Sequence, residues 1–561
     1  MNADCRRHRV ALFAGSVAVL LPGAFWGLPS GKSVAGALVI LDGGVPYRDF
    51  WSMYAPGQFY AVAALYRVFG SELLVQGIAT VLAVSASAVA LAALMHRLGA
   101  SCGLGAMLGA LFTLMSWTTA PELSDYPLAL PFLLLALERS VRYVDGGGAR
   151  HLRWSGAWLG VAACFKHDVA AYFALGTAIA LVLSWRGARG ARPAGWISPW
   201  RATMITAAFA VAAAAPLAAW TAVSAGPDAW NDLFVFPATV FRKVRNEPFP
   251  PLIPDFAPIA AWLADPLHIR RALRASDGVA TWIVLYAPVL VLLTGVGVLV
   301  WNRRTLEGRT KAVLILLLAC MPFFLAAVQV QHNTHPYTLA ILSAGVGVVL
   351  WRNAAGRHAG RAGLRIALSA AAGIYAVGLT TPAIVAVAAV YYEWEGSRVL
   401  DLPGVRGVRL PARTYDSLFP VGRFFRTHTR EDEPIYTGLV RHDAIVINNT
   451  MLYPLAGRPA CCGYTELHPG VADRASVQER IVRRLEDGRV RAIALWEFGW
   501  APEVMEARKR RAMAAVPDAG STILDRYISE HYRVLESHGE YRVLWRRDEP
   551  WPSAGPTGGE R

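Results

Sequence analysis

The chain has 561 residues, of which 55% are hydrophobic and 17% charged, and its formal net charge is +15. Soluble domains carry about 25% charged residues, so this balance argues against a soluble protein and predicts a membrane protein with several spans. The basic residues lie in short clusters between apolar stretches, which is typical of membrane topology and argues against nucleic-acid binding.

A helix that crosses a bilayer needs about 20 mainly apolar residues. We count eleven such stretches, at 10–27, 72–95, 103–119, 126–141, 154–165, 169–185, 203–224, 279–301, 312–330, 336–351 and 366–391. The fifth and sixth are separated by Lys166, His167 and Asp168, and a single broken or re-entrant span would also fit them. The first resembles a signal peptide without a clear cleavage site, so we expect it to remain as a span. The expected fold class is a polytopic α-helical membrane protein.

The connections that are rich in Lys and Arg predict the orientation, because such loops stay in the cytoplasm. These connections are 5–9, 95–100, 142–153, 186–201, 302–311 and 352–365. They place the N-terminus inside, and an odd number of spans then places the C-terminal region outside. We therefore expect a multi-pass protein of a bacterial inner membrane.

The outer connections carry the polar motifs of the membrane part. The first, residues 29–70, contains two short apolar stretches, 31–41 and 58–69, whose spacing suits helices lying in the interface. The motif Y-R-D-F-W stands between them. Because the other polar motifs also fall on this side, we expect the costly ionisable groups to enclose one water-filled pocket there.

The last part of the chain is more charged and alternates between two kinds of pattern. Strand-like runs at 434–440 and 490–498 accompany helical patterns at 476–486 and 502–514, and the final E-Y-R-V-L-W-R-R is typical of an edge strand. The sequence therefore predicts three parts: a membrane domain at 1–391, an extracytoplasmic α/β domain at 392–548 and a disordered tail at 549–561.

The first outer loop supplies the strongest catalytic candidate, Asp49. A carboxylate in this position can act as a general base or bind a divalent metal ion. The structural alternative is that Asp49 caps its turn or pairs with Arg48. Asp42 is a second candidate, although a helix end is the commoner explanation of such a residue, and Tyr47 and Arg48 are candidate substrate ligands.

Other ionisable residues are candidates for binding substrate, and each has a structural alternative. Asp125 and Glu122 lie where a span begins, where helix capping would explain them. Three adjacent ionisable groups in a break between apolar runs are costly unless they face water, partners or substrate. The remaining candidates include an outer basic cluster that suits an anion and two histidines at a span end. The full set is Asp125, Lys166, His167, Asp168, Arg242, Lys243, His332 and His335, with Arg245 beside the basic pair.

The motif G-G-V-P-Y-R-D-F-W-S-M-Y-A-P-G-Q-F-Y, which begins at Gly43, resembles the first-loop signature of GT-C glycosyltransferases. The similarity is to bacterial members of the protein O-mannosyltransferase and aminoarabinose-transferase superfamily. F-K-H-D-V at 165–169 and Q-H-N-T-H-P at 331–336 also resemble family features. The resemblance implies transfer of a sugar, with inversion, from a polyprenyl-phosphate donor. Many relatives carry Asp-Glu at the start of the loop, where this chain has Pro29 and Ser30.

These observations lead to one functional hypothesis and two alternatives. We expect an inverting glycosyltransferase whose partners are the lipid bilayer, a polyprenyl-phosphate sugar and an extracytoplasmic acceptor that is a glycan, lipid or protein. A divalent metal is a possible cofactor. The alternatives are a transporter or flippase of a lipid-linked substrate, and a catalytically inactive relative that binds cell-envelope glycan. If Asp49 is the base, Asp49→Asn should lower turnover by about 10²–10⁴-fold.

Overall fold

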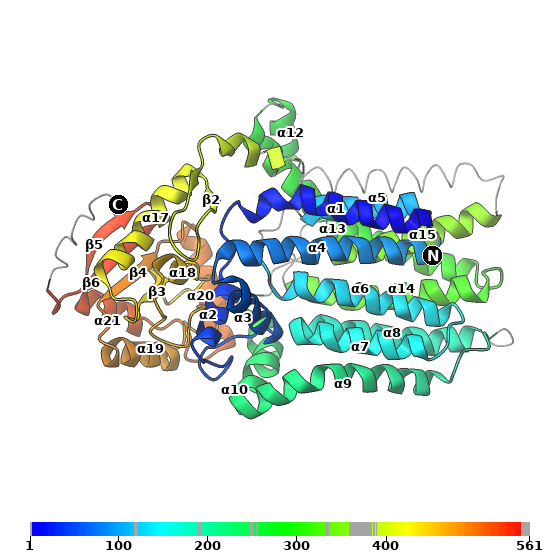
Figure 1. The fold of residues 1–561 in the computed structure, drawn as a ribbon, viewed down its shortest axis with the longest axis horizontal. Coiled ribbons are helices and arrows are strands. Elements are labelled where there is room, and N and C mark those ends of the chain that lie inside the picture. Colours follow the sequence, from blue (N-terminus) through cyan, green and yellow to red (C-terminus); the bar gives the residue numbers. More distant parts are fainter. Residues whose placement is uncertain are drawn as a thin grey trace.

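The computed structural model describes residues 3–550 except 117–121, 189–191, 246–251, 254–255, 267, 331–335, 358–383, 385–386 and 389. A bundle of long helices forms one end of the molecule, and a smaller region with a β-sheet forms the other end (Figure 1). The bundle contains α1 (Ala3–Ala24), α4 (Leu73–Arg97), α5 (Cys102–Ser116), α6 (Asp125–Val144), α7 (Arg150–Phe165), α8 (His167–Gly187), α9 (Pro199–Ala225), α13 (Ile269–Trp301), α14 (Gly308–Val330) and α15 (Pro336–Arg357).

These helices overlap the first ten stretches that the sequence predicts as spans. Within the part of the chain that the structure describes, α4, α8 and α9 are long and apolar enough to cross a membrane, and shorter apolar helices accompany them. Most of α9 is exposed on the surface of the molecule, including Val223 and Val211, as expected for a helix that faces lipid. The total of eleven spans remains a prediction, since most of the stretch 366–391 lies outside the described residues.

The structure excludes one of the alternatives that the sequence left open for residues 154–185, a single broken span that continues in one direction. Only Lys166 separates α7 from α8, and its extended backbone (φ −145°, ψ 80°) reverses the chain. Trp185, near the end of α8, stacks on Trp196, whose indole nitrogen donates a hydrogen bond to the carbonyl of Tyr143 at the end of α6. Helix α7 begins shortly after Tyr143, so α8 ends close to where α7 begins. The two helices are therefore an antiparallel hairpin and not one broken span.

The first outer loop folds as two short helices with a tight turn between them, as the sequence predicts. Helix α2 (Lys32–Leu41) packs on α3 (Gly57–Phe69), and Gly36 lies so close to the rings of Phe59 and Phe50 that no side chain would fit there. In the turn, Tyr47 has the left-handed backbone angle φ 70°. Its hydroxyl donates a hydrogen bond of 2.6 Å to the carbonyl of Tyr54.

The second long outer connection follows α9. Its described residues include α10 (Pro227–Trp230), the π-helices η1 (Asn231–Val235) and η2 (Pro237–Phe241), the short turn α11 (Arg242–Val244), and α12 (Ala257–Leu263). Helix α11 packs on α20 (Pro502–Ala515) of the C-terminal region, with Val244 buried against Ala512 and Val516. This connection therefore bridges the two ends of the molecule.

The C-terminal α/β region contains a four-stranded mixed sheet with the order β3–β4–β6–β5. Its strands are β3 (Tyr436–Leu439), β4 (Ala492–Trp496), β5 (Tyr532–His538) and β6 (Tyr541–Arg546), and a separate hairpin pairs β1 (Arg398–Val399) with β2 (Arg409–Leu410). The helices are α17 (Ala412–His428), α18 (Leu452–Ala456), α19 (Ala475–Asp487), α20 and α21 (Ile523–His531). The expectation that the last strand lies at an edge is wrong: β6 pairs with β4 on one side and β5 on the other, so both of its edges are bonded.

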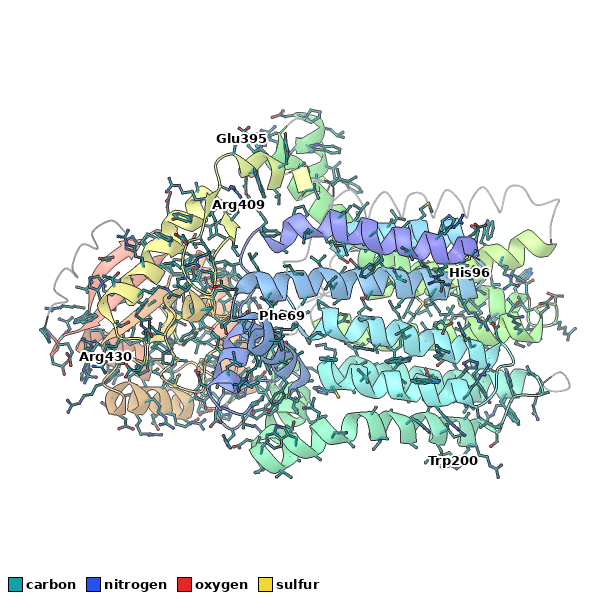
Figure 2. The ribbon with its side chains drawn as sticks, in the orientation of Figure 1. Phe69, His96, Trp200, Glu395, Arg409 and Arg430 are labelled. Atoms are coloured by element: carbon teal, nitrogen blue, oxygen red, sulfur yellow. A yellow bond between two sulfur atoms is a disulfide. The ribbon has the colours of Figure 1, made fainter. Side chains whose placement is uncertain are left out.

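Backbone hydrogen bonds join the C-terminal α/β region to the end of the helix bundle. Arg409 exchanges two of them with the chain after α1: its amide donates to Phe25 (2.7 Å), and its carbonyl accepts from Gly27 (2.9 Å) (Figure 2). The amide of Trp51 donates to the carbonyl of Gly463 at 2.8 Å. The amide of Leu73 donates to the carbonyl of Gly404 at 2.8 Å. The first outer loop is thus enclosed between the bundle and the α/β region.

Candidate functional site

Three charged side chains from separate segments come together, and one of them belongs to the first outer loop. Nζ of Lys166, at the α7–α8 turn, lies 2.9 Å from Oδ2 of Asp125, the first residue of α6. Nζ of Lys32, the first residue of α2, lies 3.6 Å from Oδ1 of the same carboxylate. All three side chains are largely buried, with exposed fractions of 16%, 7% and 13% for Lys32, Asp125 and Lys166. We call these three residues the charge cluster.

Tyr54 covers the charge cluster from the side of the loop. Nζ of Lys32 lies 3.6 Å from the centroid of the Tyr54 ring, and Nζ of Lys166 lies 5.9 Å from it. An ammonium over an aromatic face gains more in a site without water than at a surface. Burial by itself would lower the pKa of Lys32, but Asp125, Tyr54, Glu122 and Glu466 together raise it well above its usual value. Lys32 is therefore a buried, permanent cation.

The C-terminal α/β region adds a second carboxylate, Glu466. Burial raises its pKa to about 7, and the charges of Lys32 and Arg245 oppose that rise. Its Oε1 is buried, and no described residue forms a hydrogen bond with it. A carboxyl group whose pKa lies near neutrality can exchange a proton under physiological conditions, which is what a general base requires.

Further polar atoms near Glu466 are buried and have no hydrogen-bond partner among the described residues. They are Oε1 of Glu122, Nε of Arg245 and Nε2 of His468. The other carboxylate oxygen of Glu122 accepts 2.6 Å from the hydroxyl of Ser30. Buried polar groups in proteins are nearly always paired, and exceptions occur where water or a ligand completes the bonding. The arrangement therefore fits a site that binds a polar ligand.

His468 forms one wall of this region together with aromatic rings. Its ring centroid lies 5.6 Å from that of Trp51, 5.8 Å from that of Phe236 and 5.3 Å from that of Phe241. Burial, with a smaller contribution from Arg245, lowers the pKa of His468 to about 3, so the imidazole is neutral at physiological pH. The wall therefore combines three parts of the chain. Trp51 comes from the first outer loop, Phe236 and Phe241 come from the segment of η1 and η2, and His468 comes from the α/β region.

The structure contains an apolar groove of about 420 Å³. Leu123, one of its lining residues, is two positions before Asp125 in the chain. The groove lies between α3, the start of α4 and the start of α6, where Figure 2 labels Phe69. Its lining residues are Ala61, Ala64, Leu65, Val68, Phe69, Ala79, Leu123 and Leu128. An isoprenoid chain is the kind of ligand that such a surface suits.

The structure brings together several residues that the sequence singled out. Asp125 and Lys166 form the ion pair of the charge cluster, and Asp168, whose side chain is 41% exposed, lies 3.7 Å from Lys166. The Nε2 atom of His167 lies 3.1 Å from the carbonyl of Leu233. The outer connections at 29–70, 122–125, 166–168 and 225–245 therefore meet at one end of the bundle.

Other candidates lie away from the charge cluster. Asp49 accepts hydrogen bonds from the Arg48 guanidinium (3.0 and 2.7 Å) and from the amide of Val45 (2.7 Å). The bond from Arg48 is the main reason why the pKa of Asp49 is lowered. Asp42 follows α2 at its C-terminal end and is exposed.

The basic cluster and the histidine pair have different outcomes. Arg242 and Lys243 are exposed on α11, whereas their neighbour Arg245 turns inward toward Glu466 and His468. His332 and His335 lie outside the described residues.

Four residues of the site are missing from the sequence-based list: Lys32, Tyr54, Glu466 and His468. Lys32 carried a usable signal, since it is a lone charge at the start of an apolar stretch. Glu466 and His468 lie in Y-T-E-L-H-P, which looks like an ordinary polar loop, and only the docking of the α/β region buries them.

The carboxylates of the site do not form a metal-binding group. Among the described residues, one set of three potential metal ligands has its ligand atoms close enough together to hold an ion, and it is Cys5, His96 and Cys102. Their ligand atoms lie within 4.8 Å of one another. This set belongs to the opposite end of the bundle (Figure 2).

Fold and site together define an α-helical membrane protein with a buried charged site, which lies between the end of its bundle and a C-terminal α/β region. No family model and no curated protein matches the chain. Among solved structures it is similar to ArnT from Cupriavidus metallidurans bound to undecaprenyl phosphate, with 13% identity, a TM-score of 0.46, and coverage of 95% of this chain and 97% of that one. The apo state of ArnT from the same organism gives 14% identity and a TM-score of 0.44 over the same shares.

Proposed function

We propose that the protein is a membrane glycosyltransferase that moves a sugar from a polyprenyl-phosphate donor to an acceptor hydroxyl. Two features support this proposal: a buried pair of lysines that shares one aspartate, and an apolar groove lined by Leu123, which is two residues before that aspartate in the chain. A polyprenyl-phosphate sugar has the matching chemistry, since an anionic phosphate joins an isoprenoid tail to a sugar.

The two lysines are suited to the phosphate. During transfer the bond between the anomeric carbon and the phosphate oxygen breaks, and the leaving polyprenyl phosphate gains negative charge. Lys32 and Lys166 stand where fixed positive charges would stabilise that charge in a site of low dielectric constant. Asp125 between them keeps both ammonium groups in place and limits their mutual repulsion.

Glu466 is the base that this geometry favours. A new bond forms between the acceptor oxygen and the anomeric carbon, and the acceptor proton passes to the base. The pKa of Glu466 near 7 suits this step, whereas Arg48 lowers the pKa of Asp49. The other sequence-based candidates remain predictions in their original roles. Asp49 and Asp42 are the alternative catalytic carboxylates. The candidate substrate ligands are Tyr47, Arg48, Asp168, Arg242 and Lys243. Nothing in this scheme uses a metal ion.

The test is transfer of radiolabelled sugar from a polyprenyl-phosphate donor by the purified protein in detergent or liposomes. We expect turnover in the wild type and a loss of about 10²–10⁴-fold in Glu466→Gln. Asp49→Asn is the matched comparison, and the Asp49 hypothesis requires the larger loss to fall on that variant instead.

A protein that binds the donor but transfers nothing would point to the inactive relative. Movement of the intact donor across liposomes would point to the flippase.

A further inference from the structure

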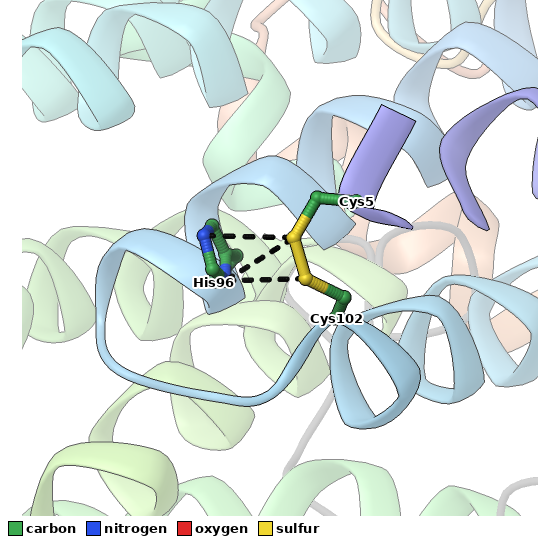
Figure 3. Close-up of side chains that lie close together, drawn as sticks. All are labelled: Cys5, His96 and Cys102. Carbon is green, nitrogen blue, oxygen red and sulfur yellow. Dashed lines mark hydrogen bonds between the residues drawn. A yellow bond between two sulfur atoms is a disulfide. The ribbon is translucent and has the colours of Figure 1, made fainter. Parts of the chain in front are cut away.

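A second cluster with chemical potential lies at the end of the bundle that is opposite to the charge cluster. Cys5 near the start of α1, His96 in the last turn of α4 and Cys102 at the start of α5 come together there (Figure 3). The Sγ atom of Cys5 lies 3.8 Å from Nε2 of His96, and Sγ of Cys102 lies 3.9 Å from its Nδ1. Cys5 is buried, Cys102 is half-buried and His96 reaches the surface.

The histidine is held in the way that metal ligands are held. Its Nδ1 lies 3.1 Å from the carbonyl of Ala100, which is hydrogen-bond distance. A proton on Nδ1 that is donated to this carbonyl leaves Nε2 with its lone pair free. Metal-binding histidines almost always fix their second ring nitrogen in this manner, so the ring orientation is set before any ion arrives.

The two sulfurs are joined as a disulfide in the structure. The neighbours of this cluster, however, are the basic residues Arg6, Arg7 and Arg97, and such clusters mark the cytoplasmic side of a membrane protein. Disulfides are rare in that compartment because cellular thiols reduce them. Two electrons and two protons from the cytosolic thiol pool convert the bond into two thiols.

We propose that Cys5, Cys102 and His96 bind a zinc ion at the cytoplasmic end of the bundle. Two thiolates and one imidazole are a known zinc ligand set, with a water molecule as the fourth ligand. Around a tetrahedral ion with Zn–S of about 2.3 Å and Zn–N of about 2.1 Å, sulfur and nitrogen stand roughly 3.6 Å apart, close to the 3.8 Å between Sγ of Cys5 and Nε2 of His96. The ligand atoms of all three residues lie within 4.8 Å of one another. Binding releases the two thiol protons, and no further redox change is needed.

The proposed ion would tie three helices together. Helices α1, α4 and α5 pack against one another along their lengths, and the site joins them at a single point near the N-terminus. The proposal does not depend on the glycosyltransferase hypothesis, since the two clusters lie at opposite ends of the bundle.

The test is metal analysis of full-length protein that is purified in detergent with a reductant and a tag free of histidine. We expect about one zinc ion per chain, and less than about a tenth of that in Cys5→Ser, Cys102→Ser and His96→Gln. His8→Gln and Cys164→Ser are matched controls: His8 is an exposed histidine on the same helix as Cys5, Cys164 is a free cysteine of α7, and both variants should keep the metal. Replacement of zinc by Co²⁺ should give the visible absorption of tetrahedral thiolate coordination in the wild type and the controls only.

Two results would overturn the proposal. One is a reduced wild type that contains no zinc and takes up none from a zinc buffer. The other is protein from freshly lysed, alkylated cells in which Cys5 and Cys102 react only after reduction, which would establish a persistent disulfide.

Discussion

The ammonium of Lys32 lies 3.6 Å from the centroid of the Tyr54 ring, so a residue of the first outer loop covers a buried cation. The carbonyl of Tyr54 in turn accepts a hydrogen bond from the hydroxyl of Tyr47. A chain of contacts therefore runs from the strained turn at Tyr47 through Tyr54 to the charge cluster. The loop is part of the wall of the site and not a cover that lies over it.

The first prediction concerns this contact. Tyr54→Leu removes the aromatic face, and we expect it to lower the free energy of unfolding by about 2 kcal/mol, because a desolvated cation–π contact is worth about that much. Tyr54→Phe keeps the ring and should lose far less. Thermal unfolding of detergent-purified variants measures the difference. Equal losses in the two variants would mean that the contact contributes little.

The second prediction concerns the ion pair between Lys166 and Asp125. Asp125→Asn leaves two buried lysines without their carboxylate and should cost about 3–5 kcal/mol, since an unpaired buried charge is expensive. The double variant Lys166→Met/Asp125→Leu should recover part of this stability but no transfer activity. Asp168→Asn is the control: its carboxylate is 41% exposed, and we expect a loss of less than about 1 kcal/mol. A double variant that is as unstable as Asp125→Asn would contradict the pairing.

The third prediction is a pH dependence of stability caused by Glu466. Its pKa is about 7 in the folded state and 4.5 as the ordinary value, so the folded protein holds more protons than the unfolded chain between these two values. Stability should therefore fall as the pH rises from 4.5 to 7, by up to about 3 kcal/mol from this group. Asp473 and Asp232, whose burial raises their pKa values to about 6, act in the same direction.

The contribution of Glu466 can be isolated by comparison with a variant. Glu466→Gln should show a smaller decline in its unfolding midpoint over this pH range, and Glu479→Gln, which removes an exposed carboxylate, should behave like the wild type. Identical slopes in all three proteins would show that Glu466 titrates normally.

The fourth prediction concerns the apolar groove. Ala64→Phe places a large ring in the groove, and we expect the KM for the polyprenyl donor to rise about tenfold, because the ring displaces apolar contacts worth roughly 1–2 kcal/mol. The kcat value at saturation should stay near that of the wild type. Val211→Phe, on the exposed face of α9, is a control for a larger apolar side chain outside the groove. A donor KM that is unchanged in Ala64→Phe would exclude the groove as the lipid site.

The sequence predicted the features that depend on local chemistry. Apolar length located the helices, and the prolines and glycines between 43 and 57 located the turn of the first outer loop. The cost of burying charge singled out Lys166, whereas helix capping was the favoured explanation of Asp125, and the structure pairs the two side chains. The same reasoning favoured Asp49, but Asp49 forms an ion pair with Arg48, the preceding residue in the chain.

The contacts between regions that are distant in the sequence could not be predicted from the sequence alone. Glu466 is separated by more than 200 residues from the carboxylate and the cations that surround it, and nothing in its local pattern indicates burial. β6 lies inside the sheet because it pairs with the distant strand β4 as well as with β5, its neighbour in a tight hairpin. Patterns along the chain report which faces are apolar, whereas the order of strands and the contacts between regions depend on the whole fold.

The backbone bond between Trp51 and Gly463 has an evolutionary consequence. A chimera that exchanged only the last 170 or so residues with a homologue would replace one side of the contact between the first outer loop and the α/β region and keep the other side. Residues 43–57 and 461–474 should therefore diverge together, because a change on one side of this contact requires a matching change on the other.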